Sequence, residues 1–166
     1  MLKKPVVAII MGSDSDYPVM QEASKVLSEF GVPFEVKILS AHRSPDLAAE
    51  FAKSARKNGF KIIIAGAGGA AHLAGVIASH TTLPVIGVPM ETDNLKGIDS
   101  LFSTVQMPGG VPVSCMAIGK AGAKNAAITA LEILSLMDAG IEKKLESFKK
   151  SMVDVIKKKN KGLRLK

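Results

Sequence analysis

The chain has 166 residues, of which 47% are hydrophobic and 4% aromatic, with one Tyr and no Trp. This length suits a single domain with a full core, and the few aromatic residues argue against a protein that stacks single-stranded nucleic acid on exposed rings. The net charge of +7 comes entirely from residues 142–166, which hold ten Lys and Arg and three acids, because residues 1–141 hold twelve of each. A basic tail of this kind is more often a solvated helix face than a nucleic-acid arm, so we expect no nucleic-acid partner.

Cysteine content and hydropathy bear on the compartment. Cys115 is the single cysteine, so no intrachain disulfide can form, and nothing points to an oxidising compartment. The apolar run at 5–12 is shorter than a typical signal core, and no stretch reaches the length of a membrane span. We therefore expect a cytoplasmic protein with no membrane partner.

Apolar runs and helix-like segments alternate along the chain. Strands are predicted over 5–12, 34–40, 61–67, 84–89 and 111–118, and several of these runs are hydrophobic enough to be covered on both faces. Helices are predicted over 16–31, 44–59, 70–80 and 120–140, with a short helical piece around 98–104. Gly31 and Gly59 end the first two helices, while Ser44 is an N-cap and Pro45 the first helical residue of the second.

This alternation predicts parallel βαβ units and therefore an α/β fold. We expect a three-layer α/β/α sandwich with a flavodoxin-like parallel sheet over residues 1–141. Residues 142–166 predict an extra basic C-terminal helix and tail. Its apolar face would carry Leu145, Phe148, Met152 and Val155 or Ile156, and would pack on the domain or on a neighbouring subunit.

The first loop to follow a predicted strand reads MGSDSDYP, residues 11–18. In a sheet of this kind, ligands lie beyond the carboxyl ends of the strands, so the loops at these ends are the candidate site. Ser13, Ser15 and Asp16 are small polar residues at a helix start, where backbone N–H groups can receive an anion. Simple N-capping explains these residues equally well.

The loop after the second strand reads SAHRSP, residues 40–45. A histidine can accept and return a proton near neutral pH, and an adjacent arginine can bind a phosphate through its planar fork. His42 and Arg43 are therefore candidates for proton transfer and phosphate binding, although a structural role for His42 remains an alternative.

The loop after the third strand, AGAGGAAHLAG at 65–75, is rich in glycine. Gly68 and Gly69 would let the backbone approach a flat ligand closely, and His72 would open or cap the next helix. A helix-end histidine bonded to backbone explains His72 without any chemistry. The long loop after the fourth strand names no chemistry, and Met90 within it is predicted to serve packing.

Several familiar site signatures are missing from the sequence. No Cys/His cluster has metal-ligand spacing, and neither a serine nucleophile elbow, a Walker lysine nor a dinucleotide fingerprint is present. We therefore predict no metal and no cofactor.

Six motifs taken together resemble one family. GSDSDYPVM, SAHRSP, AGAGGAAHLAG, LPVIGVPM, GIDSLFSTVQMPGGVPV and AIGKAGAKNAA, in this order between about residues 5 and 138, are similar to the class I N5-carboxyaminoimidazole ribonucleotide mutases of bacterial-type purine synthesis. The resemblance implies an isomerase that moves a carboxylate from the exocyclic nitrogen of the ribonucleotide to C4 of its imidazole. It also implies a homo-octamer with sites at subunit interfaces and no metal, ATP or organic cofactor.

The resemblance also implies roles for individual residues. His42 matches the catalytic histidine, Arg43 the phosphate-binding arginine, and Ser13 and Asp16 the nucleotide-binding positions of the first loop. The substrate-binding residues predicted in this way are Ser13, Ser15, Asp16, Ser40, Ala41, Arg43, Gly68, Gly69, Ala70, Ala71, His72 and Leu73. Ala74, Val76 and Gly109 depart from the family pattern, but none is a predicted site residue.

Three other functions remain open at this point, and the least expected is nucleic-acid binding through the basic tail, which predicts a steep salt dependence. The related carboxylase adds free CO2 to aminoimidazole ribonucleotide on the same fold. A non-enzymatic nucleotide-binding or receiver-like module is a second alternative because this sheet order hosts many functions, although the third predicted strand ends without the aspartate that a receiver needs.

Overall fold

The computed structural model describes residues 4–163. Its strands are β1 (Val7–Met11), β2 (Phe34–Ile38), β3 (Ile62–Ala67), β4 (Val85–Pro89) and β5 (Ser114–Cys115). A short 3-10 helix, η1 (Asp14–Asp16), precedes the helices α1 (Tyr17–Phe30), α2 (Pro45–Ala55), α3 (Leu73–His80), α4 (Ile98–Val105), α5 (Lys120–Ser135) and α6 (Ala139–Leu163).

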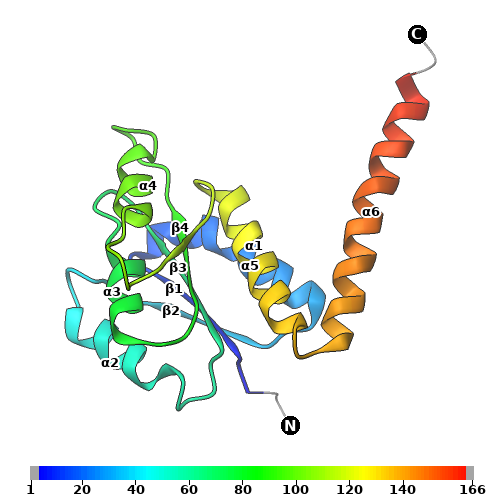
Figure 1. Ribbon diagram of the computed structural model, residues 1–166. Helices are drawn as coiled ribbons and strands as arrows, with labels where there is room; N and C mark the ends of the chain where they lie inside the picture. Colours follow the sequence, from blue (N-terminus) through cyan, green and yellow to red (C-terminus); the bar gives the residue numbers. More distant parts are fainter. Residues whose placement is uncertain (1–3, 164–166) are drawn as a thin grey trace. The chain divides into compact units, whose positions relative to one another are not determined.

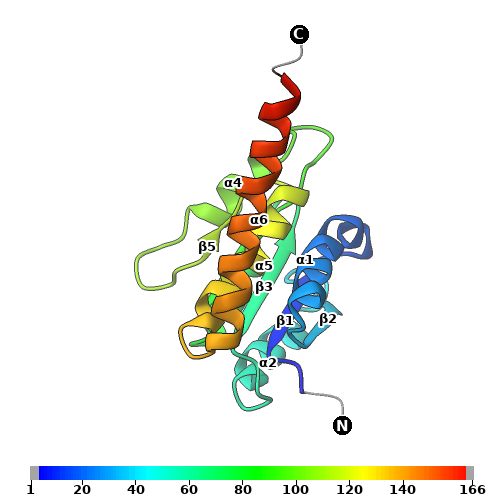
Figure 2. The same ribbon diagram turned by 90° about the vertical axis from the view of Figure 1, so that its right-hand side faces the viewer.

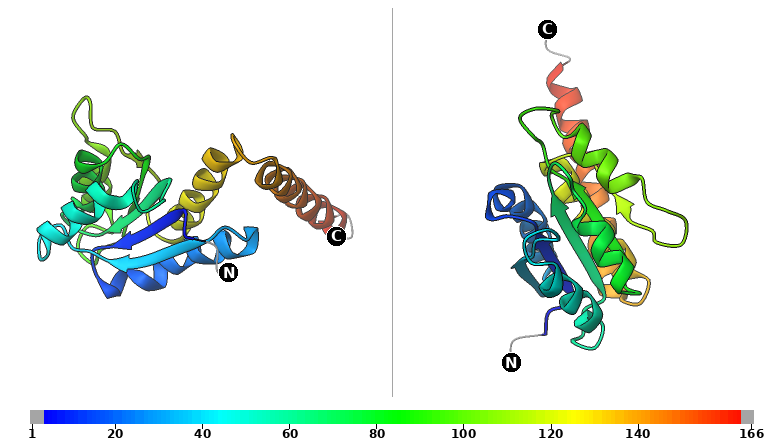
Figure 3. Two further views of the ribbon diagram at one scale, coloured as in Figure 1. Left: turned by 90° about the horizontal axis from the view of Figure 1, so that it is seen from below. Right: turned by 90° about the vertical axis from the view of Figure 1, so that its left-hand side faces the viewer.

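The five strands form one parallel sheet in the order β2-β1-β3-β4-β5. In its central register Ile9 of β1 lies opposite Val36 of β2 and Ile64 of β3, and β2 and β5 form the two edges (Figure 2). Helix α1 lies on one face of the sheet, and α2 and α3 lie on the other (Figures 1 and 3). The predicted flavodoxin-like α/β fold is thus confirmed.

The core lies on both sides of the central strands, since every residue of β1 and β4 is buried. Alternate strand residues face opposite helical layers. Ala8, Ile10 and Ile63 pack with residues of α2 and α3, while α1 buries Met20, Ala23, Leu27 and Phe30. The edge strand β2 is not among the strands covered on both faces, because its Val36 and Ile38 are exposed.

Several element boundaries also differ from those predicted. Helix α2 ends at Ala55 rather than Gly59, α3 begins at Leu73 rather than at residue 70, and β5 has two residues. Prolines cannot donate a ladder hydrogen bond, and those at 108 and 112 fit the short strand. The helix expected over 120–140 stops at Ser135, and a new helix follows Asp138, whose carboxylate accepts hydrogen bonds from the backbone N–H groups of Gly140 and Ile141.

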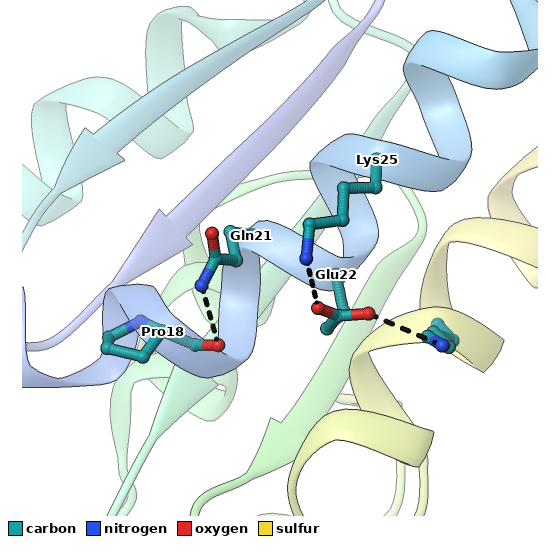
Figure 4. Close-up of polar contacts among 5 residues, drawn as sticks. Pro18, Gln21, Glu22 and Lys25 are labelled. Atoms are coloured by element: carbon teal, nitrogen blue, oxygen red, sulfur yellow. Dashed lines mark hydrogen bonds and ion pairs between the residues drawn. The ribbon is translucent and has the colours of Figure 1, made fainter.

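An ion-pair cluster joins α1 to the first part of α5. Glu22 pairs with Lys25 one turn further along α1 and with Nζ of Lys124 at 3.4 Å (Figure 4). The bond from Lys25, followed by that from Lys124, lowers the pKa of the Glu22 carboxyl, against the effect of burial. Of the two contacts, only the one with Lys124 joins α1 to α5, because Lys25 belongs to α1 itself.

The chain divides into two compact units, Met1–Ala130 and Leu131–Lys166. The first holds the sheet. In the second, Lys149 pairs with Glu132 at 3.2 Å, Leu145 is buried, Phe148 is half-buried, and Met152, Val155 and Ile156 are exposed. The predicted boundary at residue 141 and the packing of the C-terminal helix stay predictions. No helix within residues 4–163 has both the length and the apolar character that crossing a membrane requires.

Candidate active site at the carboxyl edge of the sheet

A cavity of about 540 Å³ opens beyond the carboxyl ends of the strands. The loops after β1, β2, β3 and β4 surround it, which places it where the strand order reverses between β1 and β3. Its lining residues are Gly12, Ser13, Ser15, Asp16, Ser40, Ala41, His42, Arg43, Ala67, Gly68, Ala70, Leu73, Met90, Glu91 and Thr92.

The first loop is shaped by a reciprocal capping box around η1. The Ser13 hydroxyl accepts a hydrogen bond from the Ser15 backbone N–H at 3.4 Å, and the Asp16 carboxylate accepts one from the Ser13 N–H at 3.1 Å. The N-capping interpretation is therefore confirmed, and the same residues line the cavity, while anion binding by this loop stays a prediction.

The pKa values of two carboxyl groups in this loop, those of Asp14 and Asp16, are shifted in opposite directions. Burial raises the pKa of Asp16, although the backbone N–H groups of Ser13 and Gly12 and the charge of Arg43 oppose the shift. A hydrogen bond from the Ser13 hydroxyl is the largest cause that lowers the pKa of Asp14. Asp16 is thus the carboxylate whose ionisation is costly, and it lines the cavity.

The second loop places Arg43 beside the first loop. The Ser40 hydroxyl accepts the Arg43 N–H at 3.1 Å, and Ser44 closes the turn by donating its hydroxyl to the Ser40 carbonyl at 3.1 Å. The Arg43 guanidinium donates one hydrogen bond to the Gly12 carbonyl at 3.0 Å. This bond places the planar, positively charged guanidinium, which has five N–H donors in all, beside Gly12 and Ser13 in the cavity wall.

His42 contacts the second histidine of the predicted site. Its Nε2 lies 2.9 Å from Nδ1 of His72, and the two rings meet edge to face with centroids 5.0 Å apart. A short contact between ring nitrogens requires one to donate and the other to accept. The pair therefore links the loop after β2 to the loop after β3 through one side-chain hydrogen bond.

The third loop turns at Gly69, which adopts the left-handed conformation with φ of 68°. Its N–H donates to the buried hydroxyl of Ser100 at 2.9 Å. His72 forms the N-cap of α3 but makes no side-chain capping bond, which agrees with its side chain being directed to His42. The chain between Gly69 and His72 forms a tight backbone turn, in which the Ala71 N–H donates to the Gly69 carbonyl at 2.8 Å.

Most of the predicted site residues line the cavity, but Gly69, Ala71 and His72 do not. Ala71 is buried, and His72 contacts His42 from the side. Four lining residues were not predicted, namely Gly12, Ala67, Glu91 and Thr92, and Met90 was predicted to serve packing alone. Their position at or just beyond the carboxyl ends of β1, β3 and β4 is the signal that could have identified them, because the other lining residues also follow strands. Within residues 4–163, no group of three His, Cys, Asp or Glu side chains is arranged to hold a metal ion.

The sheet order and the position of the cavity define a flavodoxin-like α/β protein with a candidate ligand site at its topological switch point. The model of the AIR carboxylase family matches residues 6–154, and the chain belongs to this family. The resemblance found from the sequence motifs is confirmed.

Named relatives support the same assignment. The N5-carboxyaminoimidazole ribonucleotide mutase of Pyrococcus horikoshii is 56% identical over 161 residues, covering 97% of this chain and 90% of the relative. The protein of that name from Haemophilus influenzae is 50% identical over 156 residues, with 94% and 95% covered. The crystal structure of Treponema denticola PurE is similar with a TM-score of 0.86 at 27% identity, covering 96% of this chain and 98% of that one.

Proposed function

We propose that this chain is an N5-carboxyaminoimidazole ribonucleotide mutase in which His42 carries the protons. The reaction is an isomerisation in de novo purine synthesis, in which a carboxylate moves from the exocyclic nitrogen to C4 of the imidazole. The observation that carries the proposal is the cavity itself, which brings together three of the family-like loops around His42 and Arg43. Identities of 50% and more to relatives named for this activity support the same reaction.

Arg43 is the proposed anchor for the 5′-phosphate of the substrate. Its guanidinium can bind two phosphate oxygens through parallel N–H donors, and its bond to the Gly12 carbonyl already fixes its orientation. Ser13 and Ser15 add polar contacts beside it, and the Asp16 carboxylate is suited to accept hydrogen bonds from sugar hydroxyls. Ser40 and Ala41 complete the wall on the same side.

His42 is the proposed acid and base. An N-carboxylate is a carbamate, so protonation of its nitrogen breaks the C–N bond and leaves CO2 and aminoimidazole ribonucleotide. C4 of that imidazole then attacks CO2 and forms the new C–C bond, after which the C4 proton must leave to restore aromaticity. One histidine that first gives a proton to nitrogen and then takes one from carbon balances the cycle. The contact with His72 would orient the His42 ring for this transfer.

The loop after β3 is proposed to hold CO2 near C4. Small residues at Gly68, Gly69, Ala70 and Ala71 allow the backbone to close over a flat ring, and Leu73 lines the cavity with an apolar side chain. If CO2 stays near C4, it does not have to diffuse back to the aminoimidazole ribonucleotide, which is a proximity effect. Excluding water from the cavity keeps both species from side reactions.

The test is a stopped assay with chemically prepared N5-carboxyaminoimidazole ribonucleotide, without ATP or added bicarbonate. We expect conversion to the C4-carboxylated isomer well above the uncatalysed background. His42→Asn should lower turnover about 10²–10⁴-fold, the usual contribution of acid-base catalysis, with unchanged thermal unfolding and nucleotide binding. His80→Asn, an exposed histidine outside the cavity, is the matched control. A His42→Asn variant with wild-type turnover would refute the role of His42.

The carboxylase reaction is the second candidate, because the matching family is described by that activity. It predicts product from the unsubstituted ribonucleotide at high bicarbonate and none from the carbamate. Measuring both substrates with one preparation separates the two reactions directly.

A homo-octamer is proposed for the assembly, as the resemblance implies. Four apolar side chains at helical spacing lie along the outer side of α4 and the turn before it, and they are between 47% and 57% exposed. These residues are Leu95, Ile98, Phe102 and Val105. A contiguous apolar stripe of this kind fits a subunit contact. Light scattering should give an octamer for the wild type and smaller species for Phe102→Glu; an unchanged mass would reject this face as the contact.

The C-terminal helix and the compartment complete the proposal. Residues 142–166 would cover their own domain or a neighbouring subunit, and truncation after Gly140 should then change the assembly or its stability. A cytoplasmic location agrees with the single cysteine, which can form no intrachain disulfide.

A further inference from the structure

Helix α4 binds both backbone polar groups of one glycine in the loop after β3. The Gly69 N–H donates to the Ser100 hydroxyl oxygen at 2.9 Å, and the Ser103 hydroxyl donates to the Gly69 carbonyl at 3.3 Å. These contacts cross 31 and 34 residues of sequence. The loop after β3, which carries His72, is therefore held by α4, the helix that follows the loop after β4.

The bond to Ser100 is the stronger of the two. Ser100 is fully buried, so water cannot replace its oxygen if the hydroxyl is removed, and the Gly69 N–H would lose its partner. Ser103 is only half-buried, and its hydroxyl also donates to the Asp99 carbonyl at 2.7 Å, which leaves a smaller share for Gly69.

The position of Gly69 bears on the histidine pair. His72 lies three residues after Gly69, and the turn between them is held by backbone bonds of 2.8 Å from Ala71 to Gly69 and from His72 to Ala70. A shift of Gly69 is therefore transmitted to the His72 ring and to its 2.9 Å contact with His42. Neither Ser100 nor Ser103 lines the cavity, so neither is placed to touch the substrate.

We propose that Ser100 is a positioning residue for the carboxylate transfer, with Ser103 in a weaker supporting role. The inference rests on the proposed function, because the pair that Ser100 positions is the proposed proton shuttle. Ser100 fixes Gly69, Gly69 fixes the turn, and the turn holds His72 against His42.

This role predicts a specific kinetic pattern. Ser100→Ala should lower kcat about tenfold, the size expected for one lost hydrogen bond that leaves a buried donor unpaired. KM should stay within about threefold, because the phosphate end of the substrate meets the loops after β1 and β2 rather than Gly69. Ser103→Ala should lower kcat by about twofold to threefold, because its shared bond to Gly69 is longer.

Thr104 offers a matched control on the same buried face of α4. It is also buried, and its hydroxyl donates to the Ser100 carbonyl within the helix at 2.8 Å, without contact to Gly69. Thr104→Val removes a buried hydroxyl at nearly constant shape, so it tests general damage to α4. We expect its kcat to stay near the wild-type value.

The experiment measures kcat and KM of the full-length wild type and the three variants, together with amide hydrogen exchange at Gly69 by NMR. The expected result is a lower kcat and faster Gly69 exchange in Ser100→Ala, a smaller effect in Ser103→Ala and none in Thr104→Val. Wild-type kcat in Ser100→Ala, or an equal loss in Thr104→Val, would overturn the proposal. Should Ser100→Ala fail to fold, Ser103→Ala carries the test, and unchanged kcat there would overturn it. An inactive wild type would instead refute the proposed function.

Discussion

Replacing Gly87 with alanine tests how closely α4 is packed against the sheet. Gly87 lies in the middle of β4, opposite Ala65 of β3 and Cys115 of β5. An added Cβ would lie 2.5 Å from Cγ2 of Thr104 and 2.9 Å from Cγ1 of Val113. Both neighbours are β-branched and stiff at χ1, so they cannot rotate away at little cost.

The magnitude follows from this crowding. Overpacking a buried site costs typically about 1–3 kcal/mol, and the lower entropy of the unfolded chain offsets roughly 0.4–1 kcal/mol of it. A net loss of about 1–2 kcal/mol corresponds to a fall in Tm of roughly 2–8 °C for a chain of this size. Because Thr104 and Ser100 share one face of α4, the displacement should also loosen the bond from Gly69 and lower kcat.

The assay is thermal unfolding followed by circular dichroism, at one protein concentration because self-association stabilises the folded state. Gly109→Ala is the matched control, since its Cβ would meet no atom within 4 Å and its φ is not in the left-handed region. A Gly87→Ala variant with a Tm equal to or above that of Gly109→Ala would refute the overpacking argument.

Three further predictions concern charged side chains. Arg43→Lys keeps the charge but loses the fork, so KM should rise about tenfold with little change in kcat; steady-state kinetics with an unchanged KM would contradict it. Burial raises the pKa of Asp16, so its ionised form destabilises the fold; Asp16→Asn should raise the urea midpoint at neutral pH, and the difference should shrink as the pH falls below the raised pKa and vanish below the ordinary pKa of a carboxyl group. The Lys25 bond lowers the pKa of Glu22, so Glu22→Gln should lower the urea midpoint at neutral pH and match the wild type once the pH is below that pKa; equal midpoints at neutral pH would contradict it.

The sequence predicts the central sheet well because β1, β3 and β4 are continuous apolar runs. A strand buried on both faces has no polar alternation to confuse the pattern, and Gly31 ends α1 as expected, with φ of 71°. The short β5 and the end of α5 at Ser135 were missed, although the prolines at 108 and 112 and the capping residue Asp138 are local signals for them.

In the candidate site, too, some residues could be predicted from the sequence and others could not. Ser13, His42 and Arg43 follow strands in short loops, so their place at the carboxyl edge follows from topology. Thr92 and Ser100 lie in or beyond the long loop after β4, where sequence gives no register. Thr92 accepts the Gly97 N–H at 3.2 Å and donates to Asp99 at 2.8 Å, which fixes the start of α4. Such contacts depend on how the loop folds back, and only coordinates reveal them.

A site made of loops needs elements that hold the loops in register. Here the loop after β2 is joined to the loop after β1 by Arg43 and Gly12, and to the loop after β3 by His42 and His72. Helix α4 then joins the loop after β3 to the loop after β4, through Ser100 on one side and the Asp99 bond to Thr92 on the other. Acid-base catalysis requires its groups to be held within hydrogen-bond reach, so we expect these cross-links, as well as the sheet, to affect the rate of the proposed proton transfer.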